Sequence, residues 1–253
     1  MHVVTLLTDF GDYYPGIMKG VILKICPNAR IVDITHSVEP QNVYQGAFLL
    51  YHSYRFFPES VHIAVVDPGV GSDRRALIVE CREHIFVGPD NGILYPSAKE
   101  NGIKRIWRIN ESKTSRFTGT LSSTFHGRDV FAPASALALL GRIDEIAEPC
   151  KEMVELELYD YRINGDLLEC RVIYIDRFGN AVTNVREEDI VDAKGFYVNG
   201  KYVPIVRTYS DVAVGEPLAL IGSFGTLELS VRNGSFANSF GIKSGRFRMR
   251  VVW

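Results

Sequence analysis

The feature that most limits the possible folds recurs through the first half of the chain: a short apolar segment runs into a loop containing an acid and a glycine. The segments with the length and composition of buried strands are residues 3–8, 61–66 and 85–87. The loops that follow them contain Asp9, Asp67 and Asp90. Acids at the ends of buried strands are well placed for chemistry in an open α/β sheet. The pattern therefore predicts a sheet and a candidate site at its edge.

Segments with a helical spacing of apolar residues separate these strands. They span residues 16–25, 42–57 and 93–100, and further strand-like segments lie at 30–34 and 104–109. Strands that alternate with helices predict an α/β fold with a mostly parallel sheet covered by helices on both faces. In such a sheet Asp9, Asp67 and Asp90 share one edge. Each acid could instead cap a helix or a turn, but three at one edge favour a site.

The loop that starts at Asp67 has an unusual composition. It contains Gly69, Gly71, Arg74 and Arg75 before the next apolar segment begins. Glycines allow backbone conformations barred to other residues and let a ligand come close. A structural β-turn with a capping Asp explains this loop equally well when the loop is considered alone.

His126 lies just before a predicted buried helix that is rich in Ala and Leu and ends near Gly141, a suitable helix-stopping residue. A histidine at this point could face the same sheet edge as Asp67. A hydrogen-bonded histidine in a turn is the more ordinary interpretation. The residue pattern alone leaves these two interpretations open.

The character of the chain changes near residues 149–153. Short alternating strands are predicted from there on, most clearly at 156–158, 167–175, 195–206 and 246–252. Asn199-Gly200 lies between two alternating segments and predicts a tight hairpin. We therefore predict an N-terminal α/β domain at 1–152 and a small antiparallel, barrel-like β domain at 153–253.

Two stretches of the second half are candidate binding segments. In residues 176–180, Phe178 could stack on a planar heterocycle while Asn180 bonds its edge, although a β-bulge or turn around Gly179 is the structural alternative. The other stretch, 222–228, is rich in glycine and polar residues, and its pattern alone indicates no particular chemistry.

Composition and motifs exclude several classes of function. The formal charge of −2 gives no electrostatic case for a nucleic-acid partner, and no apolar run is long enough to cross a membrane. The scattered cysteines are typical of reduced core thiols, and the N-terminus enters a strand without a charged leader, so we expect a cytoplasmic protein. Phosphate-loop, dinucleotide, serine-hydrolase and zinc signatures are absent from the sequence, and we expect no metal.

An ordered set of motifs runs through the whole chain. The motifs are Thr8-Asp9-Phe10-Gly11, Asp33-Ile34-Thr35-His36, Val66-Asp67-Pro68-Gly69-Val70-Gly71, Gly88-Pro89-Asp90-Asn91-Gly92, Phe125-His126-Gly127-Arg128-Asp129, Asp176-Arg177-Phe178-Gly179-Asn180 and Ser223-Phe224-Gly225. In these motifs the chain resembles the adenosine-forming S-adenosylmethionine hydrolases, also called SAM hydroxide adenosyltransferases. That family is related to the fluorinases and chlorinases.

The resemblance implies a reaction and its residues. Water or hydroxide attacks the ribose 5′ carbon of S-adenosyl-L-methionine and releases adenosine and L-methionine, without a cofactor. The resemblance assigns catalysis to Asp67, Arg74 and His126. It assigns the ribose hydroxyls to Asp9 and the adenine to Asn180 and Phe178. For the methionine end it suggests Asp176 and Ser223, and Glu228 follows at the spacing seen in the hydrolases. It also implies a homotrimer with sites at subunit interfaces.

Two rival functions remain at this point. The halogenases carry Tyr where this chain has Asp67 and His126, so these two residues favour a hydrolase. A carboxylate beside the line of attack would also repel a halide ion. The other rival is a non-catalytic protein that binds adenosine or S-adenosylmethionine in the same pocket.

Overall fold

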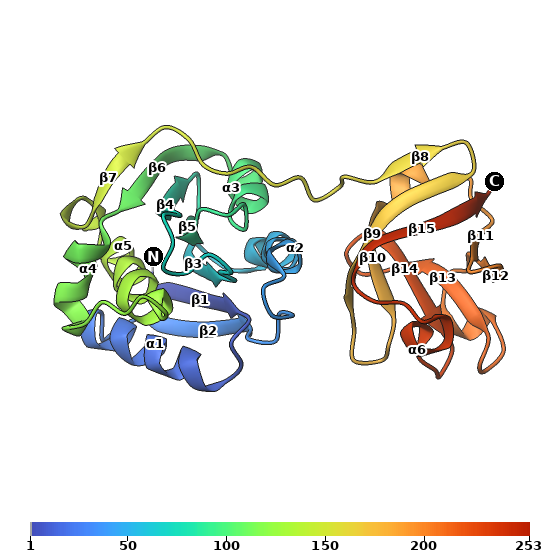
Figure 1. Cartoon of the computed structure of the whole chain (residues 1–253), viewed down its shortest axis with the longest axis horizontal. Helices are drawn as coiled ribbons and strands as arrows, with labels where there is room; N and C mark the ends of the chain where they lie inside the picture. Colours follow the sequence, from blue (N-terminus) through green and yellow to red (C-terminus); the bar gives the residue numbers. More distant parts are fainter. Residues whose placement is uncertain (1) are drawn as a thin grey trace. The chain divides into compact units, whose positions relative to one another are not determined.

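The computed structural model describes residues 2–253, and the chain divides between Leu156 and Glu157 into two compact units (Figure 1). Each unit has its own sheet and its own apolar core. The mixed α/β character of the first unit and the antiparallel β character of the second confirm the predicted fold class.

The first unit is built on a seven-stranded sheet with the order β2-β1-β3-β5-β4-β6-β7. Its strands are β1 (Val3–Thr8), β2 (Arg30–Thr35), β3 (Ser60–Val65), β4 (Ala76–Cys81), β5 (Ile85–Pro89), β6 (Ile103–Ile109) and β7 (Ala147–Cys150). Strands β2, β1, β3 and β5 are parallel neighbours, whereas β4 is antiparallel to both β5 and β6, and β7 is antiparallel to β6. The sheet is thus mostly parallel, with antiparallel pairing at one side.

Helices cover both faces of this sheet, as predicted. They are α1 (Tyr13–Ile25), α2 (Val43–Ser53), α3 (Tyr95–Asn101), α4 (Glu111–Thr118) and α5 (Ala132–Leu139). On one face α1 and α5 pack together over Val61, Ile63 and Val65 of β3. On the other face α2 packs with α3, and the ring of Tyr54 meets that of His62. Because β3 is buried on both faces, it is apolar almost throughout.

One predicted strand, 156–158, is wrong. Residues 152–157 have no regular secondary structure, and Leu158 lies in a turn. The reason is local. The Val154 N–H donates to Asp90 Oδ1 at 2.7 Å. Leu156 packs closely over Gly92, where an added Cβ would lie 2.8 Å from the Cβ of Leu156. The apolar alternation of this segment comes from packing on a loop and not from strand pairing.

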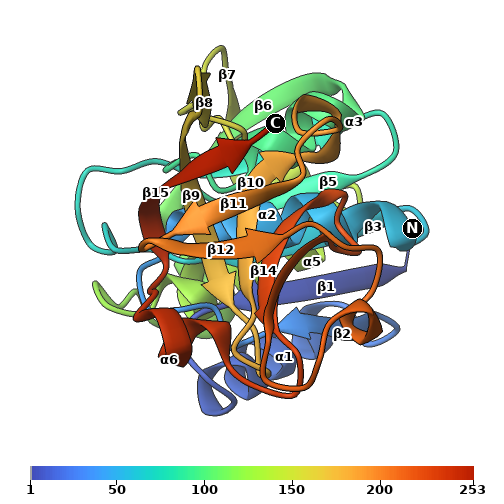
Figure 2. The same ribbon diagram turned by 90° about the vertical axis from the view of Figure 1, so that its right-hand side faces the viewer.

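The second unit is an antiparallel sheet (Figure 2). Its strands are β8 (Arg162–Asn164), β9 (Leu167–Ile175), β10 (Ala181–Arg186), β11 (Gly195–Val198), β12 (Lys201–Pro204), β13 (Pro217–Ile221), β14 (Thr226–Val231) and β15 (Gly245–Val252), with the short helix α6 (Phe236–Phe240) before β15. The predicted hairpin at Asn199-Gly200 is confirmed, with both residues at positive φ. A bridge between Ile205 and Ala219 links the chain after β12 to β13, the strands at the two ends of the strand order.

Candidate active site

Three neighbouring parallel strands deliver acids to one edge of the first sheet. β1 and β3 pair in register up to Thr8 and Val65, so Asp9 and Asp67 follow at the same end. β5 lies on the other side of β3 and ends at Pro89, directly before Asp90. The predicted sharing of one edge is confirmed by this pairing.

Asp90 has a structural role at this edge. Its Oδ2 accepts from Arg75 Nε at 2.7 Å, and its Oδ1 accepts the N–H of Val154 at 2.7 Å. The carboxylate is almost wholly buried. Asp90 is thus engaged in an ion pair and a long-range backbone contact, and it fixes the chain that leaves this unit.

Asp67, Arg74 and His126 form one connected group. Arg74 donates from Nε and from Nη2 to the Asp67 carboxylate, with a shortest distance of 2.7 Å. Its Nη2 also lies 2.7 Å from His126 Nδ1. The side chains of Asp67 and Arg74 are 6% and 9% exposed, so this ion pair is shielded from water. The structure thus brings together the three residues to which the resemblance assigns catalysis.

This contact sets the tautomer of His126. A guanidinium can only donate hydrogen bonds, so Nδ1 of His126 must accept and the ring proton must sit on Nε2. His126 therefore presents an N–H at its other nitrogen. Among the described residues, Asp67 Oδ1 accepts only the Nε–H of Arg74, so it keeps a lone pair for another donor.

A fourth residue, Glu111, joins the group and was not predicted. Its Oε1 accepts from Arg74 Nη1 at 3.2 Å and lies 3.5 Å from His126 Nδ1. It is the first residue of α4, whose N-terminus is capped by the Asn110 side chain. An Asn before an acidic helical turn is a start signal that could have revealed this helix from the sequence.

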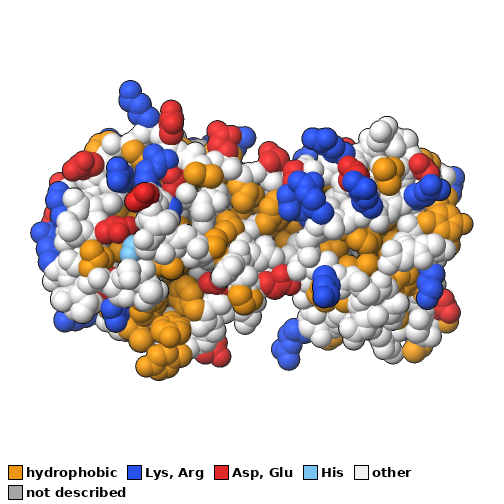
Figure 3. Space-filling model, in the orientation of Figure 1, with side chains coloured by type: hydrophobic (Ala, Val, Ile, Leu, Met, Phe, Trp, Pro, Cys, Tyr) orange, Lys and Arg blue, Asp and Glu red, His pale blue; other side chains and the backbone are white. Residues whose placement is uncertain are grey.

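The group borders a pocket of about 340 Å³. Its polar wall includes Asp9, Asp67 and His126, and its aromatic wall consists of Phe10, Tyr14 and Phe125. Asp9 is held in place because its Oδ2 accepts the N–H of Gln41 at 2.7 Å. Aromatic rings beside carboxylates suit a cationic or heterocyclic ligand. Figure 3 shows hydrophobic side chains gathered over α1, the helix that carries Tyr14.

Gly71 is required for packing in the loop between Asp67 and Arg74. Its φ is +78°, and a Cβ there would lie 2.5 Å from the carbonyl oxygen of Ser123. The glycine thus lets the loop approach the segment that leads to His126. We expected the glycines of this loop to make room for a ligand, but at Gly71 the close neighbour is backbone.

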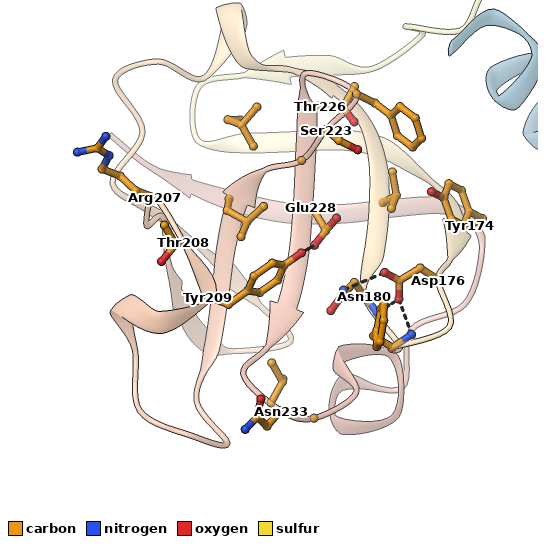
Figure 4. A pocket seen from close by; sticks show the side chains of 18 residues that line it. Tyr174, Asp176, Asn180, Arg207, Thr208, Tyr209, Ser223, Thr226, Glu228 and Asn233 are labelled. Atoms are coloured by element: carbon orange, nitrogen blue, oxygen red, sulfur yellow. Dashed lines mark hydrogen bonds between the residues drawn. The ribbon is translucent and has the colours of Figure 1, made fainter. Parts of the chain in front are cut away.

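The second unit holds a larger pocket of about 1020 Å³ (Figure 4). All the remaining predicted binding residues line it, namely Asp176, Phe178, Asn180, Ser223 and Glu228. The predicted site residues therefore fall into two groups, one in each unit.

Asp176 organises the turn that carries Phe178 and Asn180. Its Oδ1 accepts both their backbone N–H groups at 2.8 and 2.9 Å, and its Oδ2 accepts Asn180 Nδ2 at 2.9 Å. Since a carboxylate only accepts, the orientation of the Asn180 amide is settled. Phe178 is 77% exposed, so its ring is free to cover a ligand. A Cβ at Gly179 would overlap Ser235, which explains the glycine.

Glu228 is the buried acid of this pocket. Its Oε1 accepts from Tyr209 at 2.6 Å and from Ser230 Oγ at 2.9 Å. Burial, followed by the hydrogen bond to Glu228, raises the pKa of Tyr209, which therefore stays a donor. Tyr209 and Thr226 also line the pocket and were missed, because nothing in their local sequence marks them. Within residues 2–253, the buried Thr226 Oγ1 has no hydrogen-bond partner.

In the described part of the chain no group of three or more His, Cys, Asp or Glu side chains could hold a metal ion. None of the described helices is long and apolar enough to cross a membrane.

The first unit of this chain is an α/β unit with an acid–arginine–histidine group at its strand ends. The second is an antiparallel β unit with a large pocket. Together they define a class of two-unit α/β-plus-β enzymes. Two solved structures share this architecture. A protein from Thermotoga maritima matches with a TM-score of 0.86 and 32% identity, covering 99% of this chain and all of its own. One from Thermus thermophilus matches with a TM-score of 0.78 and 32% identity over the whole of both chains.

Sequence comparisons give the family. Residues 4–147 match the N-terminal domain of SAM hydroxide adenosyltransferases, and residues 170–247 match their C-terminal domain. The chain belongs to the SAM hydroxide adenosyltransferase family, as its motifs indicated.

Named relatives fall into two groups. An (R)-S-adenosyl-L-methionine hydrolase from Methanocaldococcus jannaschii is 41% identical and covers 75% of this chain and 69% of its own length. Another, from Thermus thermophilus, is 36% identical, and the match covers 97% of this chain and 98% of the relative's own length. A fluorinase from Actinoplanes sp. is 24% identical over 96% of this chain and 95% of its own. The chain is thus more similar to these hydrolases than to this fluorinase.

Proposed function

We propose that this protein hydrolyses S-adenosyl-L-methionine to adenosine and L-methionine. The observation that carries the proposal is the group of Asp67, Arg74 and His126, in which Asp67 and His126 line one pocket. The hydrolase names of the more similar relatives support the same reaction.

The proposed step is a direct substitution at carbon. The oxygen of a bound water attacks the ribose 5′ carbon while the bond from that carbon to sulfur breaks. The bonding electrons pass to sulfur, which leaves as the neutral thioether of methionine and needs no acid. One proton of the water must be removed for each turnover. Confining the water in line with the bond supplies much of the acceleration.

We assign the proton to Asp67. In the tautomer described above His126 Nδ1 is occupied by Arg74 and Nε2 carries its hydrogen, so His126 can orient the water as a donor but has no free lone pair. Asp67 Oδ1 does have one. Arg74 holds both partners, so the water is fixed between an acceptor and a donor.

The substrate contacts are carried over from the family resemblance. Asp9 takes the ribose hydroxyls, Asn180 the adenine edge and Phe178 its face. Asp176 and Ser223 take the methionine end. Glu228 completes the pocket of the second unit. The fixed Asn180 amide and the exposed Phe178 ring support the adenine assignment.

A halide-using enzyme is the second candidate, favoured only by the fluorinase relatives. The Asp67 carboxylate at the pocket wall opposes it, because an anion held there would be repelled by an adjacent negative charge.

We further propose that the reaction needs no cofactor or metal, that the protein is a homotrimer with substrate sites at subunit interfaces, and that it works in the cytoplasm. The trimer rests on the family resemblance and on the separation of the candidate residues into two units. The cytoplasm is supported by four free cysteines, Cys26, Cys81, Cys150 and Cys170.

Product analysis tests the proposed reaction. Purified protein is incubated with S-adenosyl-L-methionine in ¹⁸O-labelled water, with and without chloride, and the products are separated by chromatography. We expect adenosine labelled at the 5′ oxygen, together with methionine, in both buffers. Adenosine at no more than the rate of the protein-free control contradicts the proposal. Chlorodeoxyadenosine in the chloride buffer would favour the halogenase instead.

A further inference from the structure

We propose that Glu111 is a positioning residue of the active site: it holds the Arg74 guanidinium so that one of its nitrogens reaches both Asp67 and His126. The inference rests on the proposed hydrolase function and adds a residue to it. No sequence motif pointed to Glu111, which comes from a helix that the sequence did not predict.

The hydrogen bonds around Arg74 show the need for such a residue. Nε and Nη2 are bound to Asp67, and Nη2 is also bound to His126. The remaining nitrogen, Nη1, is bound by Glu111, next to the contact with His126. A guanidinium held at all three nitrogens cannot turn about its long axis, so the two Nη2 contacts keep their geometry.

The surroundings of Arg74 Nη1 make its hydrogen bond to Glu111 important for holding the guanidinium. Asp67 and His126 line the pocket of about 340 Å³, whereas Arg74 and Glu111 line a separate one of about 690 Å³. This second pocket is bounded by polar side chains, among them Ser72, Asp73, Arg108, Ser112 and Glu148. Without Glu111 the Nη1 edge would face this open, hydrated space. The guanidinium would then have room and alternative partners to move away from His126.

Glu111 is itself held firmly. The Asn110 side chain caps α4 by accepting the Lys113 N–H, and the Asn110 N–H donates to the Ile146 carbonyl at 2.7 Å. An acid in the first helical turn is also favoured by the helix dipole. In addition, α4 packs against the π-helical turn Gly127–Phe131 that follows His126. One helix therefore fixes Glu111 relative to both of its partners.

Glu111 acts on His126 through Arg74, because the nearby His126 Nδ1 carries no hydrogen in the tautomer described above. Oε1 accepts from Arg74 Nη1 and lies 3.5 Å from His126 Nδ1. Arg74 is additionally covered by the ring of Phe131, with the guanidinium carbon 5.4 Å from the ring centre. Phe131 limits movement perpendicular to the guanidinium plane, and Glu111 limits movement within it.

Three variants test the inference. Glu111→Leu keeps the side-chain bulk but removes the acceptor, whereas Glu111→Gln keeps an acceptor oxygen for Nη1. Glu145→Leu is the matched control: Glu145 binds Arg116 of the same helix, and its side chain is 34% exposed compared with 31% for Glu111. For each we measure kcat, KM, the melting temperature and the ring ¹⁵N shifts of His126.

We expect Glu111→Leu to lower kcat by about 10- to 100-fold with KM within about threefold, because misplacing catalytic groups by about 1 Å can cost ~100-fold. Its melting temperature should match that of Glu145→Leu, whose kcat should stay within about twofold of wild type. Glu111→Gln should recover most of kcat. The ¹⁵N shifts should show the Nε2–H tautomer in wild type and a mixture in Glu111→Leu.

Several outcomes overturn the inference. They are an unimpaired kcat in Glu111→Leu, an equal loss in Glu145→Leu, and a Glu111→Gln variant as poor as Glu111→Leu. If Glu111→Leu does not fold, Glu111→Ser, which is too short to reach Nη1, takes its place with the same expectations. The wild-type assay separates this inference from the proposed function: no adenosine from wild type refutes both, whereas normal wild-type turnover beside an unimpaired Glu111 variant refutes the inference alone.

Discussion

Two buried polar clusters lie along strand β3, one in the strand and one just after it, and their surroundings differ. The end cluster follows the strand and consists of Asp67, Arg74, Glu111 and His126. The mid-strand cluster is built around His62, near the centre of the strand, and also contains Thr5 and His84. Both contain a histidine that is at most 5% exposed. Burial alone therefore does not separate a reactive cluster from a structural one.

The mid-strand cluster is uncharged. His62 bonds Thr5 Oγ1 at 2.7 Å and His84 Nδ1 at 3.0 Å, and its ring stacks on Phe86. Burial lowers the pKa of His62 to about 3, with a smaller contribution from the nearby His84, and also lowers the pKa of His84. Near neutral pH these side chains are fixed, neutral packing elements.

The end cluster keeps its charges by pairing them. Arg74 lies between two carboxylates and against the acceptor nitrogen of His126, and the cluster opens on a pocket. The cost of burying each ion is offset by its partners, and a lone pair and an N–H remain for a bound water. Charge pairing beside a cavity is thus what distinguishes the reactive cluster.

The largest effect should come from Asp67→Asn. The amide oxygen can still accept from Arg74, but the amide cannot take a proton, so we expect kcat to fall by roughly 10²- to 10⁴-fold. The melting temperature should also fall, because the buried Arg74 loses a charged partner. Steady-state kinetics and thermal unfolding measure both quantities. The contrasting variant is His62→Gln in the mid-strand cluster, for which kcat at pH 7 should stay within about twofold. A similar kcat for Asp67→Asn and wild type would remove the distinction between the clusters.

Acid should destabilise the mid-strand cluster. The pKa of His62 is about 3 in the folded state compared with an ordinary value of 6.5, so the unfolded state binds more protons between these values. Its contribution to stability is complete above about pH 6.5 and is lost as the pH falls towards 3, on the order of 5 kcal/mol in total. Urea unfolding at pH 7 and at pH 4.5 measures the loss. His62→Gln should have a flatter pH dependence, and an unchanged slope would contradict this account.

The sequence analysis named no strand at β7, β8, β10, β13 or β14. The other strands of both units were predicted, because β-branched apolar runs carry a strong local signal. Helix α4 was not, since its sequence ESKTSRFT is polar and only Thr114 is buried. Its position is set by the Asn110 cap and by packing on the π-helical turn Gly127–Phe131. Missing this helix meant missing Glu111 as well.

Long-range pairing explains the other omissions. The contact between Arg74 and Glu111 joins residues 37 positions apart, and the one between Thr5 and His62 joins residues 57 apart. Family motifs named Asp67, Arg74 and His126, but neither motifs nor periodicity gives the hydrogen bonds between them. The strand predicted at 156–158 failed because alternation also arises where a segment packs on a loop.

Gly71→Ala tests the loop that joins Asp67 to Arg74 in the end cluster. Gly71 and Gly119 have nearly the same φ, +78° and +76°, but only at Gly71 would a Cβ meet the backbone, at Ser123. We expect Gly119→Ala to lower the free energy of unfolding by about 1 kcal/mol through strain alone. Gly71→Ala should lose about 2–3 kcal/mol and also reduce kcat, because the loop that joins Asp67 to Arg74 must move. Equal losses in both variants, measured by urea unfolding, would show that the contact with Ser123 is unimportant.

The smallest effect should come from Thr5→Val, which leaves His62 Nδ1 buried without its hydrogen-bond partner. We expect a loss of about 1 kcal/mol in unfolding free energy and an unchanged kcat. Thr8→Val is the matched variant on the same strand, since Thr8 bonds His36 Nδ1 at 2.9 Å. His36 Nε2 also lies 3.0 Å from Asp33 Oδ1, so the ring keeps a carboxylate partner when Thr8 is replaced, and Thr8→Val should cost less. A larger loss of unfolding free energy in Thr8→Val than in Thr5→Val would contradict this explanation. It would show that the acid beside His36 does not make the two threonine–histidine pairs differ.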